Sequence, residues 1–103
     1  MELETLLKFF PPGLRDLILG NDISDVMVNA DGSVYVDRNG QLSRAPAATI
    51  DPKDLLMPVQ NIARGIGRDL SEREPVLDGR LPDGSRVAAM LLAGELSLTI
   101  SQI

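Results

Sequence analysis

Tight-turn sequences at short intervals are the feature that most constrains how this chain can fold. Asp31-Gly32 and Asn39-Gly40 bracket a run of alternating apolar and polar residues, and Pro82-Asp83-Gly84-Ser85 and Ala93-Gly94-Glu95 bracket an apolar run. Glycine and asparagine tolerate the positive φ angles that hairpin turns require. Alternation with a period of two is typical of strands with one buried face. The pattern predicts antiparallel strands at residues 23–29, 33–38, 41–45, 75–81, 86–92 and 96–100.

Two helical segments are expected before the first strand. Leucine and phenylalanine recur at helical spacing within residues 2–10, and Pro11-Pro12 should end that helix because proline has no amide proton. Residues 13–19 form a second candidate helix, with Gly20 directly after it as a C-terminal cap.

A longer amphipathic helix is predicted between the two groups of strands. Asp51 suits the N-cap and Pro52 the first helical position, and an apolar stripe with helical spacing then continues to Ile66. Pro58 lies inside the pattern, so it should kink the helix or delay its regular start. Glycines at 65 and 67 should end it.

The order of these elements predicts an α+β fold. We expect an antiparallel sheet of about six short strands with helices packed on it, similar to a PAS domain, preceded by one or two N-terminal helices. Within a single compact unit, residues 1–22 form the N-terminal helical segment and residues 23–103 the α+β domain.

Composition excludes several kinds of functional site. The 103 residues include no Cys and no His, which rules out disulfides, Cys/His zinc sites, thiolate nucleophiles and Ser-His-Asp triads within them. The three aromatic residues are too few for a platform on which nucleic-acid bases stack. The net charge of −5 also argues against DNA binding, so no nucleic-acid partner is expected.

Targeting and membrane signals are absent from the sequence. Residues 1–4 are acidic where a signal peptide would be basic, and the longest apolar stretch, residues 87–93, is too short to span a bilayer. The expected location is therefore cytoplasmic, without direct membrane insertion.

Arg80 and Arg86 are the candidate binding residues. They flank one tight hairpin, where two guanidinium groups could converge on a phosphate. The structural alternative is that either arginine pairs with Asp78 or Asp83 across the hairpin, within a solvated, salt-bridged face.

Self-sufficient catalysis is not indicated. Carboxylate pairs such as Asp22 with Asp25, or Asp78 with Asp83, could in principle serve as acid and base, but aspartates in turns usually bond the backbone. No serine has an activating base, and no Gly-x-x-x-x-Gly-Lys-Ser/Thr phosphate loop is present. Residues 65–67 lack the third glycine of a dinucleotide-binding fingerprint. No metal site and no cofactor of the chain's own is expected.

The run EPVLDGRLPDGSRV at residues 74–87 resembles a segment of the type II and type IV secretion ATPases, especially their CpaF-like, Tad-pilus and conjugation-type branch. In that family a P-hydrophobic-x-D-(A/G)-R-L-P-D-G-S-R-V segment lies in the N-terminal domain. ISDVMVN at residues 23–29, VYVDRNG at 34–40, the helix at 55–67 and LTI at 98–100 are similar to family segments in the same order.

The resemblance implies a function that the residues alone do not. Family members are hexameric cytoplasmic motors at the inner membrane that use ATP and magnesium for secretion or pilus assembly. Their nucleotide lies between the N-terminal domain and a RecA-like domain, where arginines of the N-terminal side approach the phosphates. Arg80 and Arg86 occupy the matching positions, and the implied partners are a RecA-like domain, neighbouring subunits and other secretion or pilus components.

The sequence also departs from the family pattern. Ser101-Gln102-Ile103 stands where the family has Arg-Lys-Phe, and the preceding loop lacks the usual Pro-Pro. Since the 103 residues contain no Walker A loop, acidic box or His motif, we expect this chain not to hydrolyse ATP. The alternative is a stand-alone protein-binding or regulatory module of a bacterial secretion or pilus system. A small enzyme that uses Asp78 and Asp83 is the third possibility.

Overall fold

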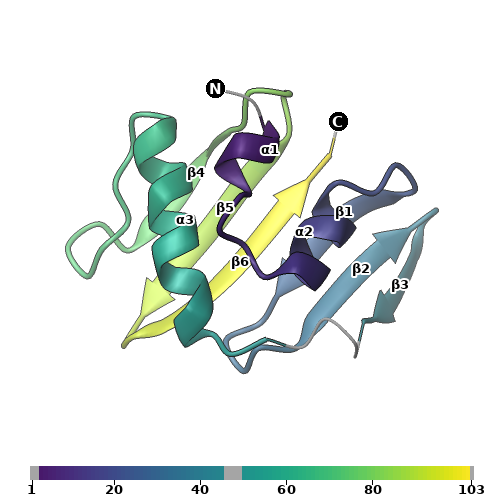
Figure 1. Cartoon of the computed structure of the whole chain (residues 1–103). Helices are drawn as coiled ribbons and strands as arrows, with labels where there is room; N and C mark the ends of the chain where they lie inside the picture. Colours follow the sequence, from purple (N-terminus) through teal and green to yellow (C-terminus); the bar gives the residue numbers. More distant parts are fainter. Residues whose placement is uncertain (1–2, 46–49, 103) are drawn as a thin grey trace.

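A six-stranded antiparallel sheet with helices on one face forms the architecture of the chain (Figure 1). The computed structural model describes residues 3–45 and 50–102. The strand order is β3-β2-β1-β6-β5-β4, and the predicted α+β class is confirmed. In chain order the elements are α1 (Leu3–Leu6), α2 (Pro12–Ile18), β1 (Ile23–Val28), β2 (Val34–Arg38), β3 (Gln41–Arg44), α3 (Lys53–Gly65), β4 (Val76–Arg80), β5 (Arg86–Leu92) and β6 (Glu95–Ser101).

Two three-stranded meanders make up the sheet, and their first and last strands join them. β1, β2 and β3 form one meander, while β4, β5 and β6 form the other. β1 pairs with β6 in the centre, with Val26 opposite Ile100 and Val28 opposite Leu98. The backbone N–H of Gln102 extends this pairing by donating to the Ser24 carbonyl at 2.7 Å.

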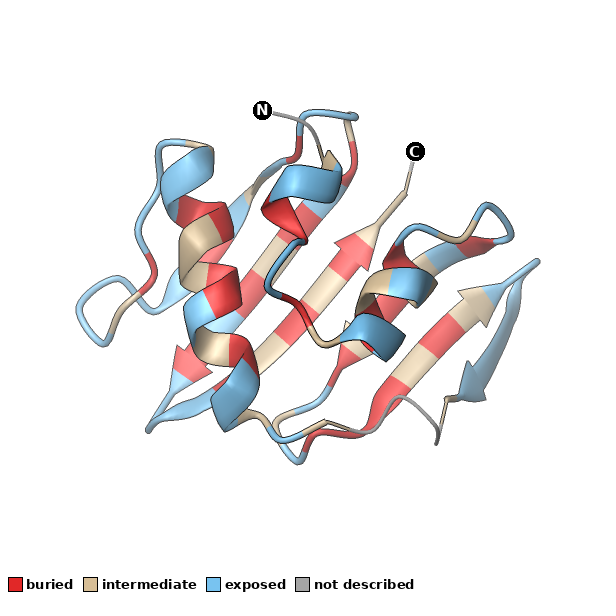
Figure 2. Ribbon diagram, viewed as in Figure 1, coloured by how far each residue is buried: buried red, intermediate tan, exposed pale blue. Residues whose placement is uncertain are grey.

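The hydrophobic core lies between the sheet and the helices (Figure 2). Inward-facing side chains alternate with outward-facing ones along the central strands, as the period of two predicts. α1 lies beside α3, and α2 lies beside β1. The helices of the N-terminal segment and the strands contribute to one buried cluster, which includes Leu7, Leu14, Ile18, Leu55, Val59, Ile62, Val87, Leu98 and Ile100.

No described helix covers the opposite face of the sheet (Figures 1 and 2). Val76, Met90 and Leu92 on β4 and β5 are all more than 45% exposed there. The strand residues that do not point into the core therefore form an exposed outer face of the sheet.

The first helix is shorter than predicted. α1 ends at Leu6, whereas the sequence pattern predicts a helix over residues 2–10, and the start of that prediction lies outside the described residues. The chain then turns through bonds from Lys8 N–H to the Thr5 carbonyl and from Phe10 N–H to the Leu7 carbonyl, each three residues back. These tighter turns bring Leu7 and Phe10 into the core and leave Phe9 outside.

The third helix largely follows its prediction. The N-cap is Pro52 and the first helical residue is Lys53, so the helix begins one residue later than the predicted N-cap at Asp51 would place it. Asp51 still accepts a hydrogen bond from the Lys53 backbone N–H at 3.0 Å. The helix continues without interruption through Pro58, which is buried, so the delay expected from Pro58 does not occur. It ends at Gly65, and Gly67 takes a positive φ of 75°.

A bulge at Ser24 breaks the simple alternation of β1. Ile23 and Val26 are both buried although they are three residues apart, because the register to β2 shifts between Ile23 and Asp25. The Ser24 hydroxyl donates to the Asp37 carbonyl at 3.2 Å on β2. The bulge lets β1 begin with a core residue directly after α2.

Two of the turn glycines differ in the space around them. Gly32 (φ 87°) and Gly40 (φ 81°) both adopt the left-handed backbone. A Cβ on Gly32 would lie 2.1 Å from the Ile50 carbonyl oxygen, whereas one on Gly40 would meet nothing within 4 Å. Gly32 is therefore required both for its φ angle and for the close passage of the chain at Ile50.

These two glycines give a matched pair of stability tests. Gly40→Ala should cost about 1 kcal/mol of unfolding free energy, from the positive φ alone. Gly32→Ala should cost about 1–3 kcal/mol beyond that, because its methyl group would displace the backbone at Ile50. Urea unfolding followed by circular dichroism measures both, and equal losses would contradict the close approach.

Candidate functional site

The loop between β4 and β5 fixes the position of the candidate arginines. The Leu81 N–H donates to the Ser85 carbonyl at 2.7 Å, and the Gly84 N–H donates to the Leu81 carbonyl at 2.9 Å. Asp83 accepts from the Ser85 N–H at 3.0 Å and from the Ser85 hydroxyl at 2.7 Å. Ser85 is only 1% exposed and Gly84 has a φ of 89°. The loop is therefore tightly closed by its own hydrogen bonds.

The same turn occurs a second time in the chain. Asp31-Gly32-Ser33 between β1 and β2 repeats the bonds from the serine N–H, at 2.9 Å, and from the serine hydroxyl to the aspartate. Asn29 takes the place of Leu81, with a 2.9 Å bond to Ser33 and another from Gly32. The flanking residues differ, because Val28 and Val34 face the core there. The turn can therefore form without flanking arginines.

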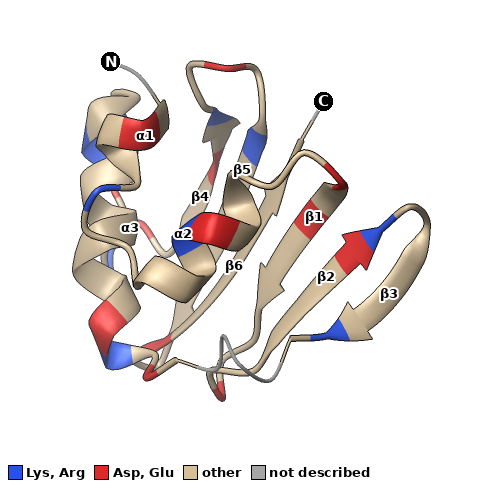
Figure 3. Ribbon diagram, turned by 45° about the vertical axis from the view of Figure 1, so that its right-hand side comes forward, with Lys and Arg blue, Asp and Glu red and all other residues tan. Residues whose placement is uncertain are grey.

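Arg80 and Arg86 lie directly opposite each other across β4 and β5. Side chains of directly opposed residues share one face of a sheet, and both arginines are exposed on the outer face. Basic positions mark the ends of these two strands beside the connecting loop in Figure 3. The structure thus brings the two predicted site residues together.

Asp78 holds Arg86 through two hydrogen bonds. Arg86 Nε donates to Asp78 Oδ1 at 3.0 Å, and Arg86 Nη2 donates to Asp78 Oδ2 at 2.8 Å. This bidentate pair lies on the outer face, with side chains 58% and 55% exposed. Donation from Arg86 lowers the pKa of the Asp78 carboxyl, and the carboxylate in turn raises the pKa of Arg86. The structural alternative considered for Arg86 is therefore realised with Asp78.

Arg80 has a different partner. Its Nη1 donates to the Gly84 carbonyl at 2.9 Å, within the loop. Asp83, the other carboxylate considered, accepts from Ser85 instead. Arg80 is therefore held by the backbone of the loop and not by Asp78 or Asp83.

The row that contains the arginines continues across the sheet. Ser101 lies opposite Arg86, Asp25 lies opposite Ser101, and Asp37 lies opposite Asp25. Position 101, where the resembling family has an arginine, is thus in the same row as Arg80 and Arg86. In this chain the row runs from two cations on one half of the sheet to two carboxylates on the other.

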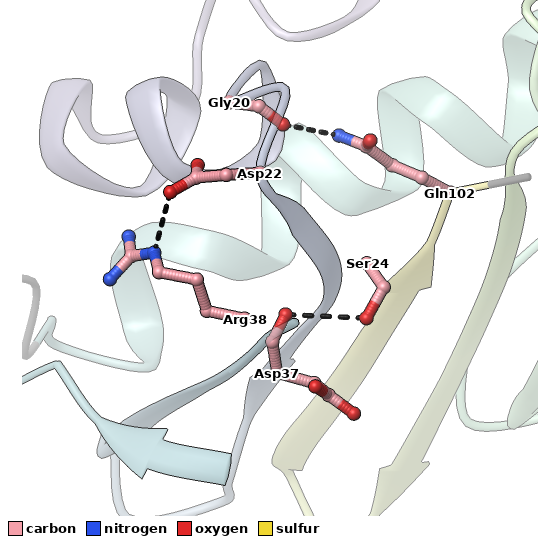
Figure 4. A network of polar contacts seen from close by, with 6 residues as sticks. All are labelled: Gly20, Asp22, Ser24, Asp37, Arg38 and Gln102. Atoms are coloured by element: carbon pink, nitrogen blue, oxygen red, sulfur yellow. Dashed lines mark hydrogen bonds and ion pairs between the residues drawn. The ribbon is translucent and has the colours of Figure 1, made fainter. Parts of the chain in front are cut away.

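The other carboxylates considered are placed in local contacts. Asp22 forms an ion pair with Arg38 at 2.9 Å (Figure 4), and the Asp25 carboxylate lies 3.2 Å from the Ser24 hydroxyl oxygen. In the described residues no group of three or more His, Cys, Asp or Glu side chains could hold a metal ion. No helix in residues 3–45 and 50–102 is long and apolar enough to cross a membrane.

Gln102 has a structural role that sequence reasoning missed. Its side-chain amide donates to the carbonyls of Ile18, at 2.8 Å, and Gly20, at 2.9 Å, after the end of α2 (Figure 4 draws the bond to Gly20). The one sequence feature that singled out this position is that Ser101-Gln102 stands where the resembling family has Arg-Lys. An amide and an ammonium can both donate to backbone carbonyls, so a lysine is compatible with the same site.

Substitutions at Gln102 test this tether. Gln102→Ala should lower the free energy of unfolding by about 1–2 kcal/mol, because two carbonyls lose their donor. Gln102→Lys should recover most of the loss. Gln102→Glu, similar in size to glutamine but without a donor when ionised, should be the least stable at neutral pH. Urea unfolding measures all three, and a glutamate variant as stable as wild type would contradict the tether.

The pKa of Asp78 provides a direct test of its pairing. In Arg86→Gln the pKa of Asp78 should rise toward its ordinary value of 3.8, because its main hydrogen-bond donor is lost. Asp31 serves as a control, since bonds from Ser33 lower its pKa independently of Arg86. Carboxyl carbon NMR titration measures both residues, and an unchanged Asp78 would contradict the pairing.

The same pairing gives a pH dependence of stability. Because the pKa of Asp78 is lowered in the folded state, the pair stabilises the fold at pH values above the ordinary 3.8. That contribution is lost as the pH falls through the folded-state pKa. Arg86→Gln should therefore lose less stability on acidification than wild type.

Comparisons with known proteins agree with this fold. No family model matches the chain. An uncharacterized protein of Methanocaldococcus jannaschii is 32% identical over 94 residues, which cover 84% of this chain and 13% of that protein. The VirB11 ATPase of the Brucella suis type IV secretion system, solved in complex with sulphate, is 26% identical with a TM-score of 0.79. The match covers 97% of this chain and 31% of VirB11.

A second solved structure has a similar fold but little sequence identity to this chain. The pilus retraction motor PilT with bound ADP is 12% identical with a TM-score of 0.50, over 100% of this chain and 29% of PilT. The chain therefore spans less than a third of the length of each of these three proteins. The resemblance to the N-terminal domain of the secretion ATPases that the sequence predicts is thereby confirmed, and the chain has the fold of a domain of this superfamily.

Proposed function

We propose that this chain is a non-catalytic module of a secretion or pilus-assembly ATPase that supplies Arg80 and Arg86 to the phosphates of a nucleotide. The nucleotide and its magnesium would be held by a RecA-like domain packed against the module, in a cytoplasmic, hexameric assembly at the inner membrane. The observation that carries the proposal is that Arg80 and Arg86 lie directly opposite each other on the face of the sheet that no described helix covers.

The repeated turn supports a role beyond hairpin structure. Residues 29–33 form the same Asp-Gly-Ser loop without arginines beside it, so the loop at 81–85 does not depend on Arg80 and Arg86. Two like charges directly opposite each other oppose folding, and Asp78 forms an ion pair with only one of them. Repulsion between the two arginines would be tolerated if their charges bind an anionic ligand.

The outer sheet face also supports packing against another domain. Val76, Met90 and Leu92 are exposed on the same face as the arginines. An apolar area next to a charged one suits an interface with an apolar centre and a polar ligand at its border. The matched VirB11 and PilT structures contain sulphate and ADP, respectively, which is consistent with anion binding in such proteins.

The chemistry follows from the charge of a phosphoryl group. Guanidinium groups stabilise the negative charge that develops when a phosphoryl group is transferred. The 103 residues contain no phosphate loop that would hold the nucleotide by itself. The module would therefore complete a site without being an ATPase, and other secretion components or neighbouring subunits would contact its remaining surface.

Alanine substitutions test the proposal in a protein that joins this chain to a RecA-like domain. Arg80→Ala and Arg86→Ala should each lower ATP turnover about 10-fold or more, since each removes a charge from the transferring phosphoryl group. Arg38→Ala is the matched control, because Arg38 is also paired with an aspartate but lies on β2. The measurement is steady-state phosphate release.

Wild-type turnover in both arginine variants would contradict the phosphate role. It would favour the alternative, a stand-alone protein-binding or regulatory module. Magnesium-dependent ATP hydrolysis by the 103-residue chain alone, abolished by substitutions at Asp78 or Asp83 that leave it folded, would favour the third possibility, a small enzyme.

A further inference from the structure

We propose that Asp78 is a positioning residue that orients Arg86 for an anionic phosphate ligand, an inference that rests on the proposed function. Asp78 bonds Nε and Nη2 of Arg86, which together form one side of the planar guanidinium group. The other edge, formed by Nη1 and the second N–H of Nη2, is turned away from the carboxylate. In the described part of the chain, the two Asp78 oxygens are the acceptors recorded for Arg86.

The position of Asp78 explains why it can act in this way. Asp78 and Arg80 are two residues apart on β4, so their side chains share the outer face. Asp78 lies opposite Ala88, whose small side chain leaves room for Arg86 to reach diagonally back to the carboxylate. Arg86 thus lies along the strand, and its unbonded edge is presented on the outer face.

Arg80 is oriented separately, by the backbone. The Gly84 carbonyl accepts from its Nη1, which fixes that guanidinium beside the loop. Two arginines held by two different acceptors lose less conformational freedom when a ligand binds than two unattached side chains would. Each arginine is therefore partly pre-organised to contact a charged group such as a terminal phosphate.

A competing arrangement would give Asp78 the opposite role. If the anion displaced Asp78 from Arg86, the carboxylate would be a competitor, and its removal would strengthen anion binding at the Nε edge that Asp78 now occupies. A positioning role predicts that the anion binds at the Nη edge, whereas a competing role predicts that it binds at the Nε edge. That difference can be measured at single nitrogen atoms.

The experiment is an NMR titration of the 103-residue chain with inorganic pyrophosphate, with the arginine side-chain N–H signals observed at low temperature. In wild type the Nη signals of Arg80 and Arg86 should shift while the Arg86 Nε signal stays in place, because Asp78 still holds it. In Asp78→Ala the Arg86 Nε proton should exchange with water about two- to fivefold faster. Pyrophosphate should then also shift the Arg86 Nε signal.

Two further variants separate charge from geometry. Asp78→Asn removes the charge but keeps one oxygen acceptor, so the Arg86 Nε signal should remain insensitive to pyrophosphate. Asp22→Ala removes a similarly exposed carboxylate from Arg38 and should leave both site arginines unchanged. Backbone amide spectra confirm that each variant is folded.

Three results would overturn the positioning role. A shift of the Arg86 Nε signal in wild type means that pyrophosphate displaces Asp78, which overturns the positioning role while leaving the phosphate role intact. If pyrophosphate shifted the Arg86 Nε signal in Asp78→Asn as much as in Asp78→Ala, only the charge of Asp78 would matter. That result would also overturn the positioning role. No shift at either arginine in wild type would contradict the positioning role, because a pre-organised Arg86 would then not meet a phosphate group in this chain. The phosphate role is decided separately, by ATP turnover of the alanine variants in the joined protein.

Discussion

The pairing of β1 with β6 is the interaction on which the rest of this structure depends. It joins residues seventy or more positions apart, with Val26 opposite Ile100, and turns two local meanders into one sheet. Closing so long a loop costs conformational entropy, which burial of both strands against the helices must offset. Gln102 extends the closure by bonding the backbone at Ser24 and the end of α2. One continuous sheet gives the chain an inner face filled by the core and an outer face that no described helix covers.

The register of β4 and β5 places two arginines together on the outer face. A closed Asp-Gly-Ser turn sets Arg80 against Arg86, and two acceptors of different kinds then hold the two guanidinium groups. The equivalent turn between β1 and β2 has valines in the flanking positions. The same type of turn is therefore flanked by buried core residues in one place and by exposed charged residues in the other. The flanking residues, and not the turn itself, therefore distinguish the candidate site.

Local features of the fold were predictable from the sequence, and long-range ones were not. Asn39-Gly40 and the Asp-Gly turns specify their own backbone, so the hairpins appear where expected. The β1–β6 pairing, the bulge at Ser24 and the tether from Gln102 depend on residues distant in sequence. The early end of α1 was also not predictable, since its apolar stripe is buried as expected although the helix ends at Leu6.

The candidate site was predictable as a pair of arginines but not in its contacts. Spacing around the turn located Arg80 and Arg86, yet both Asp78 and Asp83 were available as partners. Side-chain geometry decides between them, because Ser85 occupies Asp83 and leaves Asp78 for Arg86. That choice also defines which edge of Arg86 is available to a ligand.

A crystal structure of this domain joined to a RecA-like domain, with a non-hydrolysable ATP analogue bound, would test the central claim most directly. The account predicts that the guanidinium groups of Arg80 and Arg86 both lie within hydrogen-bonding distance, about 3 Å, of phosphate oxygens. A nucleotide bound with both arginines facing solvent, away from its phosphates, would contradict it.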